Sequence, residues 1–316
     1  MGVPALLPLP FVGPPTTQFA VDDWNARLGS VCGSFHTRAP AGVVRGSVSM
    51  QPVLGIDIAS INVGPSQIVR SQQDANRDGS AYYFLIAQRA SQVQVLHKNR
   101  STLLQAGDLV LVDSSQQSDF IYTDVSGTGM SSQFSVHIPR QFLADSVAGQ
   151  HIGEKIPAQS ALAQCVWQQL NVLQQLSALL AVPQLRTDPF EALFLKTFTQ
   201  IFSSHKHQDK FVKVVLSLLL DAGEQSSAVD HFASMSFSSR RTFFRIFENR
   251  QISFGELLKY IRLLRFLKLC NGAGTDAAPR SISTMAYAAG FTDISNFNRL
   301  FKMNFGVTPG SLFGKC

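Results

Sequence analysis

The sequence predicts an α+β protein with a β-rich N-terminal half and a helical C-terminal half that ends in two helix-turn-helix units. Three observations predict this class. Short segments rich in β-branched and aromatic residues alternate with turn residues as far as Ile138. From Ala161 onward, apolar residues recur at the three-or-four spacing that is typical of helices. After Ala233, one short motif occurs twice.

The length and the composition predict two globular domains. A chain of 316 residues exceeds what one hydrophobic core usually supports. Its content of 45% hydrophobic and 15% charged residues argues against a largely disordered protein. No apolar run approaches the roughly 20 residues that span a bilayer, and Met1–Pro15 lacks the Lys or Arg of a signal peptide. We therefore expect a cytoplasmic protein without a membrane segment, in which residues 1–18 are flexible.

Five segments of the first half have the composition of β-strands. They are partly alternating and are separated by Gly, Asn, Asp and Ser. The segments are Gly55–Val69, Tyr82–Arg89, Val93–His97, Leu109–Asp113 and Phe134–Ile138. Strands at this spacing predict a small barrel or a sandwich.

Two helices are expected after the strands. Ala161–Leu180 places apolar residues at positions 162, 166, 170, 173, 176 and 180, which form one face of an amphipathic helix. This face either packs inside the chain or forms a dimer interface. Phe190–Phe202 is expected to be the second helix. The polar residues 203–208 are expected to be a linker, and a new helical core begins near Phe211.

The positive charge is concentrated in the C-terminal region. The residues from Ser226 to Cys316 include twelve Lys and Arg against five Asp and Glu, which gives a net charge of +7. Because the whole chain has a net charge of +6, the residues before Ser226 carry −1. This asymmetry indicates a polyanion as the partner of the C-terminal region, and double-stranded DNA is the polyanion that we expect.

The repeated motif has the spacing of a helix-turn-helix. Its second copy begins at Ala286, 53 residues after the first. A small residue at this position lets two helices approach closely, and Gly290 can adopt the positive φ of the turn. Thr292 or Asp293 in the second copy, and Ser239 in the first, are suitable N-caps for the helix that follows.

The second helix of each copy has a buried and an exposed face. Phe243 and Phe247, like Phe297 and Phe301, lie four residues apart and are expected in the core. The opposite faces are expected to contact DNA, because Arg can read guanine, Asn can read adenine and apolar groups can contact the thymine methyl. The expected DNA-binding residues are Arg240, Arg241, Thr242, Phe244, Arg245, Ile294, Ser295, Asn298, Arg299 and Lys302.

One helix is expected to join the two copies. Phe254–Leu269 has apolar residues at positions 257, 258, 261 and 264, and a helix of this length spans on the order of 24 Å. Two recognition helices held this far apart could enter successive major grooves, which lie about 34 Å apart. Arg262 on the connecting helix is either structural or a phosphate contact.

These motifs closely resemble a known family. The sequence ISTMAYAAGFTDISNFNRLFKMNFGVTP at Ile282–Pro309 resembles the signature of the AraC/XylS transcription regulators. The sequence SSRRTFFRIFENRQISFGELLKYIRLLR resembles that family's preceding helix-turn-helix and connecting helix. The resemblance covers Asp209–Cys316. It implies a bacterial, nucleoid-associated transcription regulator that contacts RNA polymerase at σ70-dependent promoters.

The first half has a weaker resemblance to an effector domain of the same family. Asp22–Phe35, Ala81–Gln116 and Phe134–Leu143 look like the feaR-type activators of aromatic amine catabolism. This resemblance implies a cupin-like β-fold followed by dimerisation helices, and an activator that responds to a small molecule. We therefore expect an effector-binding and dimerisation domain at 19–202, a linker at 203–208 and a DNA-binding domain at 209–316, in a homodimer.

The sequence does not assign the effector-binding residues. Six aromatic residues near the strands suit an aromatic or hydrophobic effector, although such residues also form ordinary cores. They are Phe35, Tyr82, Tyr83, Phe84, Phe120 and Tyr122.

Some residues depart from the family pattern. Phe237 stands where the first turn normally has Gly, and Gln251 replaces another common Gly. The loop Asn271–Ser281 is longer than usual. We therefore expect the second helix-turn-helix to be the more reliable DNA reader, and whether the first reads bases stays open.

Two other functions also stay open. One is a regulator controlled by a protein partner or by its own abundance, and the other is a cupin-type enzyme fused to a DNA-binding domain. His36, His97, His137 and His151 form no HxH motif with a following carboxylate, so we expect no metal, no other cofactor and no catalytic residues. The four cysteines, Cys32, Cys165, Cys270 and Cys316, lie far apart and are expected to be reduced thiols.

Overall fold

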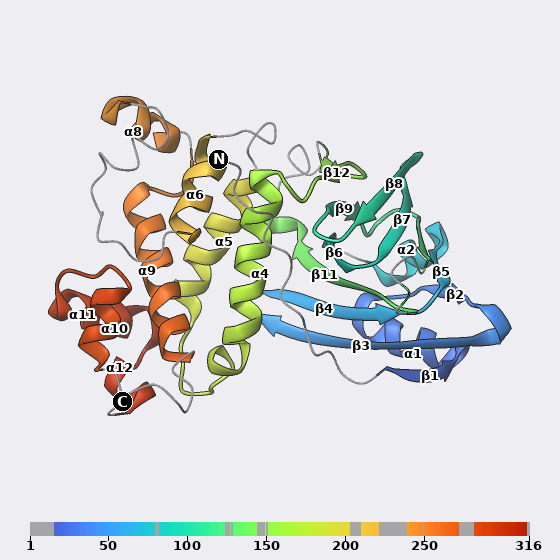
Figure 1. Cartoon of the computed structure of the whole chain (residues 1–316), viewed down its shortest axis with the longest axis horizontal. Helices are drawn as coiled ribbons and strands as arrows, with labels where there is room; N and C mark the ends of the chain where they lie inside the picture. The colour runs from blue at the N-terminus through green and yellow to red at the C-terminus, as the bar shows by residue number, and fades with distance from the viewer. Residues whose placement is uncertain are drawn as a thin grey trace. The chain divides into compact units, whose positions relative to one another are not determined.

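The described residues form two compact units in a computed structural model of the chain (Figure 1). The structure describes residues 16–79, 82–123, 127, 129–143, 149, 151–202, 210–220, 239–248, 250–271 and 281–314. The first unit, called the β-unit here, extends to Gln164 and excludes Val53–Gly55. The second, called the helical unit, begins at Cys165 and includes those three residues.

The β-unit contains two sheets that form a sandwich, as predicted. Antiparallel pairing connects β4, β11, β6 and β9 in one sheet and β5, β10, β7 and β8 in the other. The first sheet has the order β1 (Thr17–Ala20), β3 (Val43–Val53), β4 (Ile56–Val63), β11 (Ser131–Pro139), β6 (Tyr82–Ala90), β9 (Leu109–Asp113) and β12 (Lys155–Ile156). The second has the order β2 (His36–Arg38), β5 (Ser66–Arg70), β10 (Ser118–Thr123), β7 (Gln92–His97) and β8 (Arg100–Gln105).

The predicted strands are present, but one of them is two strands. The segment predicted at Gly55–Val69 contains β4 and β5, which belong to different sheets. Several further strands were not predicted. In β3, for example, Arg45 and Gly46 interrupt the apolar pattern by which a strand is recognised in a sequence. A Cβ at Gly46 would lie 2.7 Å from Cζ3 of Trp24, so glycine here admits a buried indole ring.

Among the described residues with assigned bounds, two helices and two short 3₁₀ turns also belong to the β-unit. They are α1 (Val21–Cys32), α2 (Gln72–Asp78), Pro40–Gly42 and Arg140–Phe142. Trp24 and Leu28 of α1 pack into a core formed by both sheets. Ser71 begins α2 through a capping box, in which its hydroxyl accepts from Asp74 N while the Asp74 carboxylate accepts from Ser71 N.

A buried arginine ties α2 to the strands. The side chain of Arg70 at the end of β5 is fully buried, and its Nε donates to Ser114 O at 3.0 Å. Its Nη1 donates to Ser34 O at 2.9 Å and to the Asp78 carboxylate at 2.6 Å. Asp78 also accepts from the amide and the hydroxyl of Ser34, both at 2.7 Å. The guanidinium is therefore buried with its charge paired, as a buried charge requires.

Replacing Asp78 with asparagine is expected to lower the free energy of unfolding at pH 7 by about 3 kcal/mol, the low end for breaking a buried ion pair. Partial burial raises the pKa of Asp78, but hydrogen bonds from Ser34 and the charge of Arg70 outweigh it and hold that pKa below its usual range. The ion pair therefore stabilises the fold above about pH 4 and stops doing so as the pH falls through the lowered pKa.

Chemical denaturation at several pH values checks this prediction. The stability difference between the wild type and Asp78→Asn should narrow below about pH 4, the usual carboxyl range. Asp23→Asn, in the exposed first turn of α1, is the matched control and should change little at any pH. A difference that stays constant from pH 7 to pH 3 contradicts the ion-pair explanation.

The described part of the helical unit contains helices throughout. They are α4 (Ala161–Leu180), most of which lies in this unit, α5 (Asp188–Phe202), α6 (Lys210–Leu220), α8 (Arg240–Glu248), α9 (Phe254–Asn271), α10 (Ile282–Ala288), α11 (Ile294–Phe305) and α12 (Pro309–Phe313). The predicted helices at Ala161–Leu180, Phe190–Phe202 and Phe254–Leu269 are confirmed within two residues at each end.

Helix α5 packs directly on the C-terminal helices. The ring of Phe190 lies 5.5 Å from that of Tyr260 in α9 and 5.0 Å from that of Phe305 in α11. Lys196 pairs with Glu256 at 3.2 Å, and Arg250 Nη1 donates to a backbone carbonyl near the end of α5 at 3.1 Å. The contact therefore extends along the length of α5.

The compact units and the domains expected from the sequence divide the chain at different places. The sequence places the linker between the two expected domains at 203–208, whereas the two compact units of the structure meet after Gln164. The expected linker, Phe237 and most of the loop Asn271–Ser281 lie outside the described residues. The apolar face predicted on α4 is buried at positions 162, 166, 170, 173 and 176, so it is not an exposed stripe in this chain.

Candidate nucleic-acid interface and ligand cavity

The second helix-turn-helix has the turn that its sequence predicts. Gly290 follows α10 with a φ of +95°, a conformation that glycine adopts without the strain of a Cβ. Phe291 N donates to Ala286 O at 3.0 Å and closes the turn. Ala286 is fully buried, as expected for a small residue at the helix contact.

Asp293 begins α11. Its carboxylate accepts from Ser295 N at 2.8 Å and from Asn296 N at 3.1 Å. A side chain that accepts from the first free amides stabilises a helix end by about 1 kcal/mol. Of the two residues predicted as caps, Asp293 has this role and Thr292 does not.

The inner face of α11 is an aromatic cluster. Phe297 and Phe301 are fully buried, and their rings lie 4.7 and 5.5 Å from the ring of Phe266 in α9. Phe291 of the turn packs on Phe297 at 4.8 Å. These contacts fix α11 against the connecting helix and leave its opposite face exposed.

The exposed face of α11 carries most of the predicted contact residues. Ser295, Asn298, Arg299 and Lys302 are exposed, whereas Ile294 is only partly exposed. We find Asn296 on the same face, and its Oδ1 accepts from Arg299 Nη2 at 3.1 Å. The sequence analysis missed Asn296, although its spacing of three residues from Arg299 indicates such a pair.

The second helix of the first unit, α8, has a similar division of faces. Ser239 Oγ accepts from Thr242 N at 3.2 Å and caps the helix as predicted. Phe243 and Phe247 are buried. The other predicted contact residues are partly exposed at Thr242 and exposed at Arg240, Arg241, Phe244 and Arg245.

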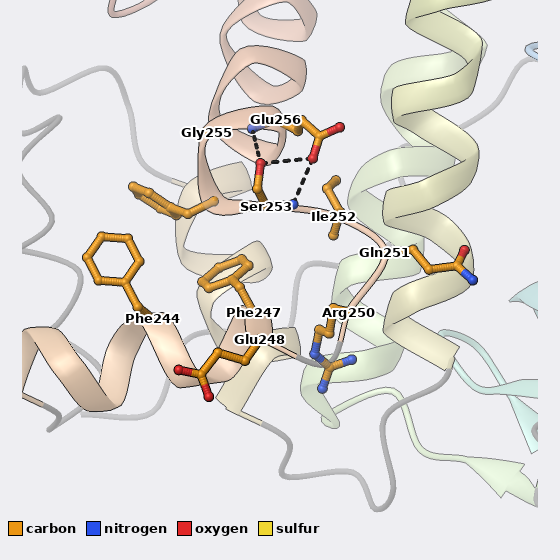
Figure 2. A pocket seen from close by; sticks show the side chains of 10 residues that line it. Phe244, Phe247, Glu248, Arg250, Gln251, Ile252, Ser253, Gly255 and Glu256 are labelled. Atoms are coloured by element: carbon orange, nitrogen blue, oxygen red, sulfur yellow. Dashed lines mark hydrogen bonds between the residues drawn. The ribbon is translucent and has the colours of Figure 1, made fainter.

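A hollow of about 530 Å³ lies between α8 and the start of α9, and Figure 2 shows the side chains that line it. Phe244, 45% exposed, lies at this hollow with Phe247.

The start of α9 is a capping box, in which Ser253 N donates to Glu256 Oε2 at 2.9 Å and Glu256 N donates to Ser253 Oγ at 3.2 Å. Gln251 is not among the described residues with a positive φ, so the usual glycine is not required there.

Two arginines of the connecting helix have structural contacts. The guanidinium carbon of Arg262 lies 6.0 Å from the ring centroid of Phe291, and its side chain lies beside Gly290. Arg265 donates to the carbonyl of Leu218 in α6. Both side chains are partly buried, which supports the structural alternative for Arg262.

The β-unit encloses a small, mostly apolar cavity of about 20 Å³, close to the room that one water molecule needs. Of the six aromatic residues singled out from the sequence, four line it, and Tyr82 and Tyr83 do not. The lining residues are Leu28, Cys32, Phe35, Ile61, Ile68, Phe84, Ile86, Phe120, Tyr122, Gln133 and Ser135. They come from α1, both sheets and the connection before β2.

The polar groups of this cavity are buried and uncharged. Burial raises the pKa of the Cys32 thiol to about 12. Burial, together with Cys32, also raises the pKa of Tyr122 against the opposing effect of Gln133. Gln133 is 2% exposed, and its Oε1 has no hydrogen-bond partner among the described residues.

The histidines within the described residues do not form a cluster. His97 Nδ1 lies 2.9 Å from Gln117 O, and its Nε2 accepts from Asp113 N at 3.1 Å. The exposed His36 has its Nε2 3.2 Å from Oδ1 of the buried Asp74, whereas the ring of His137 packs on Phe84 at 4.6 Å. Within the described ranges, no three His, Cys, Asp or Glu side chains are placed to hold a metal ion.

These features define a class of protein: a regulator in which a β-sandwich with an internal cavity precedes a helix-turn-helix domain. A family model described as an AraC-binding-like domain matches residues 24–201, and one described as a helix-turn-helix domain matches residues 232–315. The chain therefore belongs to the AraC family of DNA-binding transcription regulators, with a cupin-like N-terminal ligand-binding domain.

Two solved structures illustrate the likeness. The AraC-like transcriptional activator CuxR is 13% identical with a TM-score of 0.48, over 80% of this chain and 94% of that chain. ToxT from Vibrio cholerae, with an unsaturated fatty acid bound, is 14% identical with a TM-score of 0.30, over 82% of this chain and 95% of that chain. Among the described helices, none has the length and apolar character needed to cross a membrane.

Proposed function

We propose that this regulator activates transcription in response to a small effector held in the β-unit cavity. The exposed polar face of α11, opposite its buried aromatic face, carries the DNA-binding part of the proposal, and the cavity of the β-unit carries the effector part. Such a face suits the major groove, where side chains read base edges. An effector that binds one arrangement of the two units more tightly shifts the population toward that arrangement.

The residue roles in this proposal follow from their chemistry. Asn298 and Arg299 are assigned to bases, with Asn296 orienting the guanidinium of Arg299. Lys302 at the end of α11 is assigned to a phosphate. Arg240, Arg241, Thr242, Phe244 and Arg245 of α8, with Ile294 and Ser295, are assigned to the same DNA site.

The wider context is also part of the proposal. Domains at 19–202 and 209–316, joined by a linker at 203–208, act in a cytoplasmic homodimer that contacts RNA polymerase on the nucleoid. The feaR-type resemblance of the first half supports an aromatic effector. Sedimentation that finds only monomer at micromolar concentration contradicts the homodimer.

Substitutions on α11 test the DNA contacts. Asn298→Ala is expected to relax base preference at one position, with a loss of about 1–3 kcal/mol for the preferred base. Lys302→Ala is expected to weaken binding to every sequence and to reduce the salt slope by about one. The measurement is fluorescence anisotropy on DNA selected from a random library, at several salt concentrations.

The control for these variants removes a charge far from the proposed interface. Lys98 is an exposed residue of the β-unit, and Lys98→Gln should keep wild-type affinity and salt dependence. If Asn298→Ala and Lys302→Ala also keep wild-type affinity and preference, the assignment of α11 to the major groove is wrong.

The small cavity volume favours a second candidate, a regulator that needs no effector. A cavity of about 20 Å³ holds little more than a water molecule unless its walls move. Such a regulator would be controlled by a protein partner or by its abundance. A thermal-shift screen with aromatic amines, aldehydes, alcohols and acids separates the two, because no stabilisation by any compound favours the second.

A further inference from the structure

We infer that the β-unit cavity selects a small uncharged molecule that joins an apolar body to a single hydroxyl group. This inference rests on the proposed function, because it specifies the ligand of the proposed effector site. It follows from the walls of the cavity, from one buried amide and from the charges around them.

The cavity walls suit an apolar body. Seven of the lining residues are Leu, Ile or Phe, from α1, both sheets and the connection before β2. All eleven lining residues are less than 9% exposed. Contact with such walls stabilises a ligand in proportion to the apolar area that it removes from water.

The side-chain amide of Gln133 requires a hydrogen-bond donor from the ligand. Its Oε1 is buried and has no partner among the described residues, and such an acceptor costs about 1–3 kcal/mol while it stays unpaired. Tyr122, which interacts with the Gln133 side chain through its hydroxyl, and Ser135 line the same cavity with hydroxyl groups. A ligand hydroxyl can donate to Gln133 Oε1 and accept from one of these hydroxyls, so one functional group satisfies both sides.

The cavity offers no unpaired charge among the described residues that could balance a charged ligand. None of the lining residues is Asp, Glu, His, Lys or Arg, and burial raises the pKa of both Cys32 and Tyr122, so neither is ionised at pH 7. The Arg70 guanidinium carbon lies 5.2 Å from the ring of Phe35, but Arg70 is paired with Asp78. His137 packs behind Phe84, and burial lowers its pKa to about 4, so it is uncharged at pH 7. A carboxylate or an ammonium group would therefore be buried without an opposite charge, which is costly.

The volume limits the size of the ligand. Only about 20 Å³ is free, so the lining side chains must move apart for any organic molecule to enter. Close-packed interiors resist such movement, and the cost grows with the volume that is opened. The smallest apolar bodies are therefore favoured, and a single ring with a short hydroxyl-bearing arm is the largest that we assign.

Calorimetric titration of the full chain at pH 7 tests the inference with four probes that share one ring: benzyl alcohol, toluene, benzoate and benzylamine. Benzyl alcohol is expected to bind about ten-fold tighter than toluene, because it pairs the amide oxygen. Benzoate and benzylamine are expected to show no binding. Equal affinity of benzyl alcohol and toluene, or tighter binding of either ion, overturns the inference.

Gln133→Leu makes the test specific. The variant replaces the unpaired oxygen with an apolar side chain of similar size. It is expected to bind toluene at least as tightly as the wild type does, and to bind benzyl alcohol no more tightly than it binds toluene. Gln94→Leu, the same substitution at an exposed position of β7, should keep the wild-type preference. Tyr122→Phe, a second variant with a smaller change of shape, should also reduce the preference for the alcohol. A preference that survives both cavity variants overturns the inference.

The same samples separate this inference from the proposed function. Each protein is also titrated with the selected DNA, with and without each probe. Binding of an ion, with an effect on DNA affinity, overturns the hydroxyl inference and leaves effector control intact. No binding of any probe by a chain that binds DNA overturns the inference and counts against effector control.

Discussion

Replacing Phe301 with alanine is expected to lower the free energy of unfolding by about 3–5 kcal/mol, the usual cost of deleting a buried phenylalanine ring. The ring is fully buried, and its centroid lies 4.6 Å from that of Phe305 and 5.5 Å from that of Phe266. Folded domains are stable by only 5–15 kcal/mol in general. We therefore expect α11 to lose its fixed position and specific DNA binding to fail.

Urea denaturation and anisotropy with selected DNA measure the two effects. Met303→Ala is the matched control on the same helix, because Met303 is 62% exposed. Its effect on stability should stay within about 0.5 kcal/mol, as for most surface substitutions. If Phe301→Ala kept both wild-type stability and wild-type DNA affinity, the aromatic cluster could not be what holds α11.

The second helix-turn-helix could be predicted closely from the sequence because its determinants are local. Gly290 is needed for a positive φ four residues after Ala286, and Asp293 caps the helix that starts at the next residue. Phe297 and Phe301 lie four residues apart, which places them on one helical face. Each of these relations involves neighbours in the chain, so a short sequence motif specifies all of them.

The ligand cavity could not be predicted in the same way because its residues are far apart in the sequence. Leu28 in α1 and Gln133 in β11 line the same space. They are brought together by a strand order in which β11 lies between β4 and β6. The sequence suggested aromatic residues near the strands, and alternation along β6 places Tyr83 and Phe84 on opposite faces. Only the packing of the sheets shows that Phe84 lines the cavity whereas Tyr83 contacts Arg140.

Helix α5 shows that the limits of a sequence family and the limits of a compact unit are different properties. The model of the AraC-binding-like domain extends to residue 201 and so includes α4 and nearly all of α5. The packing of α5, however, is with α9 and α11. Phe190, Phe194, Phe198 and Phe202 of α5 are all 1% exposed or less. The DNA-binding helices therefore depend for their burial on a helix that belongs to the other sequence domain.

A fragment of residues 209–316 is consequently expected to be far less stable than a fragment of residues 161–316. The shorter fragment lacks both α4 and α5, which exposes the partners of the α5 aromatic residues, including Tyr260 and Phe305, and removes Gln169 of α4 from Tyr260. Burial of each phenylalanine contributes about 1.5–3 kcal/mol, so the sum approaches the whole stability of a small domain. We expect cooperative thermal unfolding of the longer fragment and a broad transition, or none, for the shorter one.

The difference in stability between the two fragments should come from the aromatic contacts and not from the ion pair beside them. Lys196 and Glu256 lie 3.2 Å apart, but their side chains are 42% and 34% exposed, and exposed pairs contribute at most about 1 kcal/mol. Lys196→Gln in the longer fragment should therefore shift its unfolding only slightly. Equal melting temperatures of the two fragments contradict the dependence on α4 and α5. The expected result instead shows that the fixed position of α11 depends on helices that precede residue 209.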